Sequence, residues 1–255
     1  MNNSYIHNYK NTMKKKIIIT GGSGRFGEYL KKIKSPHKLF FPNKKELNIL
    51  KPKSIESYLK AKKANIVIHL AGLSRPMDIH NKEIEKSIDL NIIGTANVTK
   101  VCSKKNVKLI YFSTNYVYPG KKGNYAETDP LLPVNNYAWS KLGGEASVQL
   151  YENSLILRVC MTEKPFVHNK AFANVKTSFM YHDVVAKILF KVMNKKGILN
   201  IGGLPRYIYN FAKKDKINIK KTYLKKHLDL GMPFNSSINI NKMKKIIKKS
   251  KNIKL

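Results

Sequence analysis

Lys16-Ile17-Ile18-Ile19-Thr20-Gly21-Gly22-Ser23-Gly24-Arg25-Phe26-Gly27 is the stretch that decides the fold. Its β-branched run predicts a strand over residues 16–20, and its spaced glycines predict a tight turn into a helix over residues 24–34. A second apolar run, over residues 38–41, completes one βαβ unit. The free N–H groups at such a helix start can hold a pyrophosphate, although the same turn also occurs without a ligand. We therefore expect a dinucleotide to contact Gly21, Ser23, Gly24, Arg25, Phe26 and Gly27.

Beyond this unit, strand-like and helix-like segments alternate along the chain. Further strands are predicted over residues 65–70, 107–113 and 155–159, and helices over residues 54–63, 84–104, 136–151 and 184–193. This alternation predicts an α/β fold with a doubly wound parallel sheet of the Rossmann type. We expect residues 14–160 to form the dinucleotide-binding domain, with a helix over 183–194 packing back on it. Residues 161–255 are expected to form a small C-terminal substrate-binding cap.

The 255 residues carry a formal net charge of +34, which suggests a nucleic-acid partner at first sight. Only four of the 49 basic residues are arginines, so 45 are lysines, and they are spread over most of the chain. A polynucleotide site more often groups its bases, interleaves aromatic residues and uses arginine. The pattern therefore favours a solvated basic surface, whose field attracts anionic substrates, over a nucleic-acid site.

The sequence also bears on compartment and on metal binding. No apolar run reaches the ~18 residues of a membrane span, and the polar start, residues 1–16, lacks the apolar core of a signal peptide. We therefore expect a cytoplasmic protein with no membrane partner. Cys102 and Cys160 have no ligand spacing around them, so we interpret them as reduced thiols and expect no metal site.

Tyr137 and Lys141 stand four residues apart in Tyr-Ala-Trp-Ser-Lys. On a helix they lie on the same face, one turn apart, so the ammonium is expected near the phenol. A nearby cation favours phenolate and should lower the pKa of Tyr137, which suits a proton donor. Alone, such a pair is usually a surface pair. Together with the glycine turn and with Thr114 at the end of a strand, it favours catalysis.

These motifs and several others, taken in order, resemble the extended short-chain dehydrogenase/reductases, and within them the dTDP-4-dehydrorhamnose reductase family. The resemblance runs from about residue 15 to residue 161. The further residues that carry it are Glu46-Leu47-Asn48-Ile49, His69-Leu70-Ala71-Gly72, Asn91 in Asp-Leu-Asn-Ile-Ile-Gly-Thr, the segment from Phe112 to Gly120 that reads Phe-Ser-Thr-Asn-Tyr-Val-Tyr-Pro-Gly, and Glu127-Thr128-Asp129.

The resemblance implies a reductase in dTDP-rhamnose biosynthesis that acts on a nucleotide-diphosphate sugar. Tyr137 would protonate the carbonyl oxygen of a 4-keto-6-deoxy sugar while a hydride arrives from the nicotinamide. Lys141 would bind the nicotinamide ribose and tune Tyr137, and Thr114 would hydrogen-bond the same oxygen. A homodimer is compatible with this reading. The resemblance also places near the cofactor Asn43, Lys44, Asn48, Ile49, Ala71, Gly72 and Asn91, with Asn48 open to a plain turn or helix cap instead.

The choice of cofactor depends on the end of the second strand. NAD enzymes usually place an acid there for the adenosine ribose, whereas Phe41-Pro42-Asn43-Lys44-Lys45 has none before Glu46. Lys44, Lys45 or Arg25 could instead meet a 2′-phosphate. The sequence therefore favours NADPH, with NADH still open.

Departures from the family pattern define the alternatives. The related dehydratases carry an Asp-Glu pair after the threonine, where this chain has Asn115-Tyr116, so dehydration is disfavoured. A nucleotide-sugar 4-epimerase keeps the Tyr and the Lys, and would hold NAD without net consumption. A non-catalytic NADP-binding regulatory subunit is the third reading, because the beta subunit of methionine adenosyltransferase resembles this family. Downstream, His182 is expected at the surface and Asp183 as a helix cap.

Overall fold

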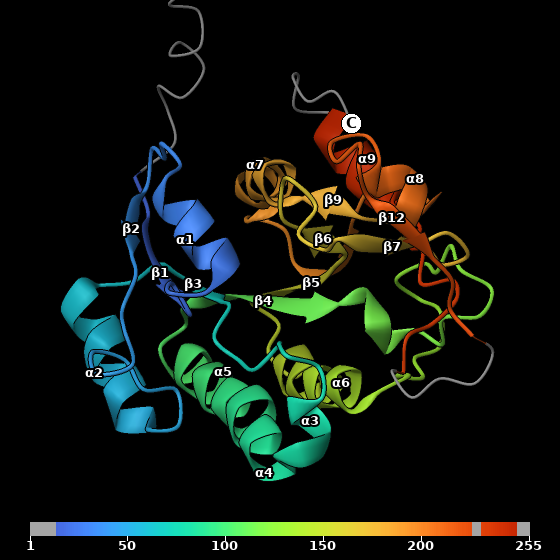
Figure 1. Ribbon diagram of the computed structural model, residues 1–255. Coiled ribbons are helices and arrows are strands. Elements are labelled where there is room, and N and C mark those ends of the chain that lie inside the picture. The colour runs from blue at the N-terminus through green and yellow to red at the C-terminus, as the bar shows by residue number, and fades with distance from the viewer. Residues whose placement is uncertain (1–13, 226–230, 249–255) are drawn as a thin grey trace, which may run out of the picture.

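The computed structural model describes residues 14–225 and 231–248, so most of the polar start and the far C-terminal end of the predicted cap lie outside the described residues. A six-stranded parallel sheet forms the centre, in the order β10-β5-β4-β3-β1-β2 (Figure 1). This confirms the predicted doubly wound α/β fold. The strands are β1 (Lys16–Thr20), β2 (Lys38–Phe40), β3 (Ile66–His69), β4 (Lys108–Thr114), β5 (Ser154–Val159) and β10 (Gly197–Ile201).

Helices cover both faces of the sheet (Figure 1). Side chains alternate between the faces of β1: Ile17 and Ile19 belong to one hydrophobic core cluster, and Ile18 belongs to the other. The first cluster includes residues of α1 (Arg25–Lys31), α7 (His182–Val192) and α9 (Asn241–Lys248). The second includes residues of α2 (Pro52–Lys62), α5 (Gly94–Lys104) and α6 (Asn136–Gln149).

The long helix predicted over residues 84–104 is present but interrupted. It consists of α4 (Ile84–Ser87), a π-helical turn η1 (Ile88–Ile93) and α5, and a short α3 (Ile79–Lys82) precedes it. The wider turn carries Asn91, whose side chain is fully buried. Such π turns often occur at functional sites, and here the turn lies directly above the loop that follows β3.

The C-terminal third holds three two-stranded pairs: β6 (Met161–Thr162) with β9 (Met180–Tyr181), β7 (Lys170–Phe172) with β12 (Lys220–Thr222), and β8 (Lys176–Thr177) with β11 (Arg206–Tyr207). α8 (Ile208–Ala212) and β7 contribute to a small separate core that also includes Phe166 and Val175. Two expectations here were wrong. His182 is buried rather than superficial, and its ring packs 5.4 Å from that of Phe26. Asp183 is not a helix cap, because Tyr181 is the N-cap residue of α7.

A strap formed by residues 231–240 lies along the loop that follows β4. Gly120 O accepts a hydrogen bond from Asn235 N at 3.0 Å, and Tyr125 exchanges backbone hydrogen bonds with Ser237 and Asn239. The loop over residues 118–133 is therefore held by residues 231–240. This strap ties the end of the chain to the segment between β4 and α6.

Within the described ranges, no helix is long and apolar enough to cross a membrane, and no group of three or more His, Cys, Asp or Glu side chains could hold a metal ion. Cys102 and Cys160 are free and buried. Burial raises the pKa of these thiols to about 12 and about 11, so both are protonated at neutral pH.

The tight turn after β1 generates a stability prediction. Gly21 has a φ of +71°, and a Cβ there would lie 2.6 Å from Ala71 N. We expect Gly21→Ala to lower the free energy of unfolding by about 2–5 kcal/mol, which combines the left-handed backbone with overpacking. Gly197→Ala is the control, because Gly197 has a φ of +81° with nothing within 4 Å of its Cβ position. Equal losses for the two variants in urea unfolding would show that the contact with Ala71 is unimportant.

Candidate functional site

The predicted dinucleotide residues lie at one edge of the sheet. In the strand order, β1 is flanked by β2 and β3, so the chain reverses its direction across the sheet at this point. In open parallel sheets, ligands bind outside the carboxyl ends of the strands at such a switch point. The turn after β1 exposes Ser23, Gly24 and Arg25 there, and a hydrogen bond from Gly24 N to Gly21 O closes it at 2.9 Å.

The turns after β1 and β3 press against each other. Thr20 Oγ1 accepts a hydrogen bond from Ala71 N at 3.3 Å, and its hydroxyl hydrogen-bonds His69 Nδ1 at 2.7 Å. Burial lowers the pKa of His69 to about 3, with a smaller contribution from Lys141, so His69 is neutral. Its other ring nitrogen meets Thr95. Ala71 is thereby brought beside the glycine turn.

Asn91 holds the loop that carries Gly72. Its Oδ1 accepts from Leu73 N at 2.7 Å, and its Nδ2 donates to Leu73 O at 2.9 Å and to Ser140 Oγ at 2.8 Å. A Cβ at Gly72 would lie 2.6 Å from this Oδ1. The side chain of Asn91 therefore ties the loop after β3 to α6. A residue with a Cβ at position 72 would collide with this side chain, so the position needs a glycine.

The turn after β2 presents lysines to solvent. Asn43 Oδ1 accepts from Lys45 N and Glu46 N, and Glu46 Oε2 accepts from Asn43 N, so the acid closes its own turn. Lys44 and Lys45 are exposed. Asn48 also forms a turn, because its Oδ1 accepts from Leu50 N at 3.0 Å.

Two predicted cofactor residues turn their side chains into the protein. Ile49 and Phe26 are 7% and 5% exposed, and each belongs to a hydrophobic core cluster. The Phe26 ring packs against the rings of Phe112 and His182, with centroids 5.3 and 5.4 Å away.

Thr114, Tyr137 and Lys141 are brought together by β4 and α6. Asn135 caps α6, accepting from Ala138 N at 2.8 Å, which sets Tyr137 in the first turn of the helix. The Thr114 side chain at the end of β4 lies near enough to the Tyr137 phenol to act on its pKa. Lys141 follows one helical turn later, with Nζ 4.2 Å from the centroid of the Tyr111 ring.

The charges in this cluster differ from the expectation based on the pair alone. Burial raises the pKa of Tyr137, while Thr114 and the charge of Arg75 act in the opposite direction. Burial also lowers the pKa of Lys141 to about 7, and Glu145 opposes this shift. The predicted lowering of the Tyr137 pKa by Lys141 was wrong. Burial of both side chains has a larger effect on the pKa of Tyr137 than the nearby lysine has.

Sequence reasoning missed Arg75, Glu163 and His80. Arg75 lies close enough to Tyr137 for its charge to act on the phenol, and the His80 ring packs at a tilt of 57° against that of Tyr137, with centroids 5.1 Å apart. Glu163 pairs with Arg25 at 3.2 Å and with Arg75 at 3.5 Å. The sequence does offer one signal for Arg75: only four of the 49 basic residues are arginines, so each arginine is a candidate for a specific contact.

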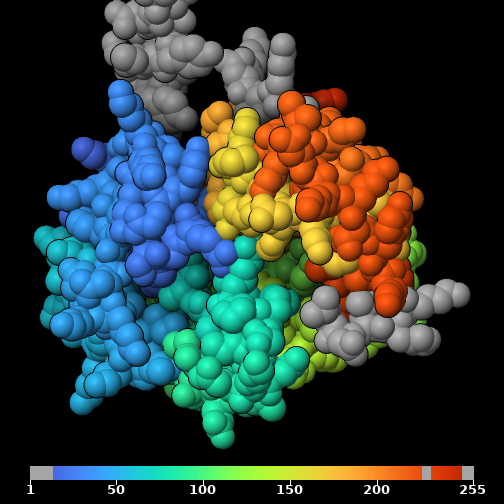
Figure 2. Space-filling model, viewed as in Figure 1, coloured from blue at the N-terminus to red at the C-terminus, as the bar shows by residue number. Residues whose placement is uncertain are grey.

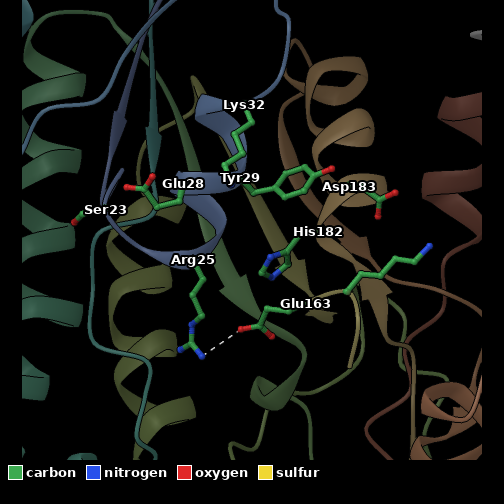
Figure 3. Close-up of a pocket in the computed structure, with 9 residues that line it drawn as sticks. Ser23, Arg25, Glu28, Tyr29, Lys32, Glu163, His182 and Asp183 are labelled. Carbon is green, nitrogen blue, oxygen red and sulfur yellow. Dashed lines mark ion pairs between the residues drawn. The ribbon is translucent and has the colours of Figure 1, made fainter. Parts of the chain in front are cut away.

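A pocket of about 550 Å³ opens between α1 and the start of α7. Figure 2 shows the blue N-terminal residues facing the yellow and orange C-terminal residues across a hollow. The lining includes Ser23, Arg25, Glu163 and His182, and the ion pair between Arg25 and Glu163 crosses it (Figure 3). None of Thr114, Tyr137 and Lys141 lines this pocket, so it adjoins the glycine turn rather than the cluster of these three residues.

Asn115, where the dehydratase pattern has an acid, hydrogen-bonds the strap formed by residues 231–240. Its side chain is 4% exposed, and Nδ2 donates to Ser236 O at 2.9 Å. A carboxylate at this place would face that carbonyl oxygen without a proton to share. The structure thus uses position 115 to hold the C-terminal region.

The role of Asn91 generates a prediction about the loop after β3. Asn91→Ala leaves the N–H and C=O groups of Leu73 without their partner, so we expect a loss of about 1–3 kcal/mol in unfolding free energy. The Leu73 amide should exchange with solvent at least about tenfold faster. Asn97→Ala removes a single hydrogen bond, to Ile49 O, and is the control. Unchanged exchange at Leu73 would show that Asn91 does not hold the loop.

Comparisons with known proteins find relatives of this chain. One relative is dTDP-4-dehydrorhamnose reductase of Aggregatibacter actinomycetemcomitans, 28% identical over 159 residues, which cover 60% of this chain and 54% of that protein. Another is methionine adenosyltransferase 2 subunit beta of Xenopus laevis, 34% identical over 114 residues, which cover 44% of this chain and 34% of that protein. The chain thus matches between about a third and about half of the length of these relatives.

A solved structure of dTDP-4-dehydrorhamnose reductase from Bacillus anthracis, in complex with NADP, has the same fold. The TM-score is 0.80 at 22% identity, with 96% of this chain and 95% of that chain covered. Residues 14–173 match the family described as the RmlD substrate binding domain. The resemblance expected from the motifs is confirmed, and because the match spans more than half of the 255 residues, the chain belongs to the RmlD substrate binding domain family.

Proposed function

We propose that this protein reduces the C4 carbonyl of a nucleotide-linked 4-keto-6-deoxy sugar with NADPH, as a step in dTDP-rhamnose biosynthesis. The observation that carries the proposal is the cluster of Thr114, Tyr137 and Lys141, in which Thr114 lies near the phenol and the lysine follows one helical turn later. These groups stand at the carboxyl edge of the sheet, where the glycine turn offers a dinucleotide site. A phenol and a hydroxyl that converge can both hydrogen-bond one carbonyl oxygen.

The protein's own residues would supply the proton and the positioning. A bound NADPH would supply the hydride. Tyr137 would donate its proton to the carbonyl oxygen, and Thr114 would hold that oxygen in place. The ammonium of Lys141 would stabilise the phenolate that Tyr137 becomes. Because the pKa of Lys141 is about 7, its charge is present below neutral pH and is lost as the pH rises above it.

The cofactor proposal rests on the charges after β2. Glu46 closes its own turn, and Lys44 and Lys45 remain exposed for a 2′-phosphate. Arg25 is paired with Glu163, which makes it the weaker candidate for that phosphate. The Bacillus anthracis enzyme of the same fold is a complex with NADP. We propose NADPH as the preferred cofactor, with NADH accepted less well.

We further propose a division of labour along the chain. Residues 14–160, with α7 and β10 packed on or into the main sheet, would hold the dinucleotide. The other described residues beyond 160, which form the small β pairs and their separate core, would shape the sugar pocket.

Two alternatives have specific support. A 4-epimerase would use the same Tyr137 and Lys141 while keeping its nicotinamide bound. A regulatory subunit is favoured by the 34% identity to methionine adenosyltransferase 2 subunit beta. The intact cluster of Thr114, Tyr137 and Lys141 supports an enzyme over a regulatory subunit. Dehydration is disfavoured because Asn115 is an amide engaged with Ser236.

The reductase proposal predicts the effect of removing one hydroxyl. We expect Tyr137→Phe to lower kcat for oxidation of NADPH by a dTDP-4-keto-6-deoxy sugar by about 100- to 10,000-fold, because the general acid is lost. NADPH affinity should change little. Tyr207→Phe, a change at a tyrosine that is 45% exposed, is the matched control. The measurement is the absorbance of reduced nicotinamide, and equal slow rates for wild type and Tyr137→Phe would contradict the proposal for these substrates.

The cofactor proposal predicts a shift in preference. Reversing both charges, in the Lys44→Glu/Lys45→Glu double variant, should weaken NADPH binding by about tenfold or more and leave NADH binding nearly unchanged, since only NADPH carries the 2′-phosphate. Lys121→Glu/Lys122→Glu, at a distant exposed lysine pair, controls for the change in net charge. Fluorescence titration with both nucleotides gives the four dissociation constants. Equal weakening of NADPH and NADH binding would show that these lysines do not recognise the 2′-phosphate.

A further inference from the structure

Lys141 is a buried ammonium in contact with the sheet. The residue is 8% exposed, its Nζ lies over the Tyr111 ring, and its backbone oxygen accepts from the Tyr111 hydroxyl at 3.0 Å. An ammonium taken out of water tends to lose its proton unless a negative charge is near. The proposed chemistry needs this ammonium to stay charged.

The titratable groups around Lys141 come from β3, β4 and β5 as well as α6. His69 of β3 is neutral, since burial holds its pKa near 3. Tyr111 of β4 is neutral, since burial raises its pKa. Tyr137 of α6 is likewise protonated, and Arg158 of β5 is a cation. Glu145, four residues after Lys141 on α6, is the acid that acts on the lysine.

Glu145 is fixed as a carboxylate and is not free to move. It is fully buried, and its Oε1 accepts from Arg158 Nε at 3.1 Å and from Arg158 Nη2 at 2.6 Å. Its Oε2 accepts from Ser113 Oγ at 2.6 Å. Arg158 is itself held by the Tyr118 hydroxyl at 2.9 Å and by Glu127 O at 3.1 Å. The negative charge thus has a set position on the same helical stripe as Tyr137 and Lys141.

We propose that Glu145 is a positioning residue that keeps the Lys141 ammonium charged, and that Arg158 limits how strongly it does so. Glu145 acts through Lys141 and touches neither substrate nor cofactor. The inference rests on the proposed function for its consequence in catalysis, but the charge coupling itself does not depend on turnover. Two residues that form one ion pair would therefore act on Lys141 in opposite directions.

The two substitutions should shift the pKa of Lys141 in opposite directions, whereas a purely structural role would give both variants the same effect. Glu145→Gln removes the negative charge, so the pKa of Lys141 should fall, and for a shift of one unit the charged fraction at pH 8 drops about tenfold. Arg158→Gln removes the cation that offsets Glu145 while Ser113 still donates to the carboxylate and favours its charged form, so the pKa of Lys141 should rise. Both variants break the same ion pair. Shifts of the same sign, or no shift, would overturn the proposal.

Two readouts separate this proposal from the proposed function. The first is 15N NMR titration of the Lys141 amine, identified by the signal that Lys141→Met removes, which needs neither cofactor nor sugar. The second is the pH profile of kcat/KM for NADPH oxidation. Glu145→Gln should approach wild-type activity near pH 5.5 and lose it at lower pH than wild type does. If the two variants shift the pKa of Lys141 in opposite directions but no variant oxidises NADPH, the charge coupling is supported and the reductase proposal is contradicted.

Controls cover folding and general charge effects. Glu152→Gln, at an exposed acid paired with Lys196, should leave the Lys141 titration unchanged. Should a single variant fail to fold, the Glu145→Met/Arg158→Met double variant replaces the whole buried pair, a change that proteins often tolerate. Glu145 is the charged group that acts on Lys141, so this variant should still lower the pKa of Lys141, and a wild-type titration in it would overturn the proposal.

Discussion

The buried ion pair between Glu145 and Arg158 is the interaction on which the rest of the site depends. It joins α6 to β5, and through Ser113 it joins α6 to β4, so the helix that carries Tyr137 and Lys141 cannot slide along the sheet. Breaking such a pair by removing one partner typically costs about 3–5 kcal/mol, because a charge is left unpaired. The position of Tyr137 against Thr114 follows from this attachment and from the Asn135 cap.

A shortage of arginine in the chain makes its few arginines informative. Among 49 basic residues, Arg158 holds Glu145 through two nitrogens, and Arg25 and Arg75 both pair with Glu163 beside the glycine turn. A planar guanidinium can donate several hydrogen bonds in fixed directions, which an ammonium cannot do. The many surface lysines give a field that attracts anions, whereas these arginines give defined geometry.

The features that depend on neighbouring residues in the sequence could be predicted from it. The β-branched run of β1, the glycine turn and the Tyr137 to Lys141 spacing each follow from neighbouring residues, and the family motifs supplied their roles. The sixth strand, β10, and the two- and three-residue strands beyond Val159 were missed, because their pairing depends on distant segments. The pKa of Tyr137 was misjudged for a related reason: the spacing shows Lys141 but not the burial that surrounds both residues.

The central claim is that a hydride passes from NADPH to C4 of a nucleotide-linked keto sugar while Tyr137 supplies the proton. Isotope transfer tests it most directly. The protein is incubated with a dTDP-4-keto-6-deoxy sugar and, separately, with each stereoisomer of NADPH deuterated at C4 of the nicotinamide, and the sugar product is analysed by mass spectrometry. The account predicts one deuterium at C4 of the sugar from one stereoisomer and none from the other. An unlabelled product from both stereoisomers, or no product, would contradict it.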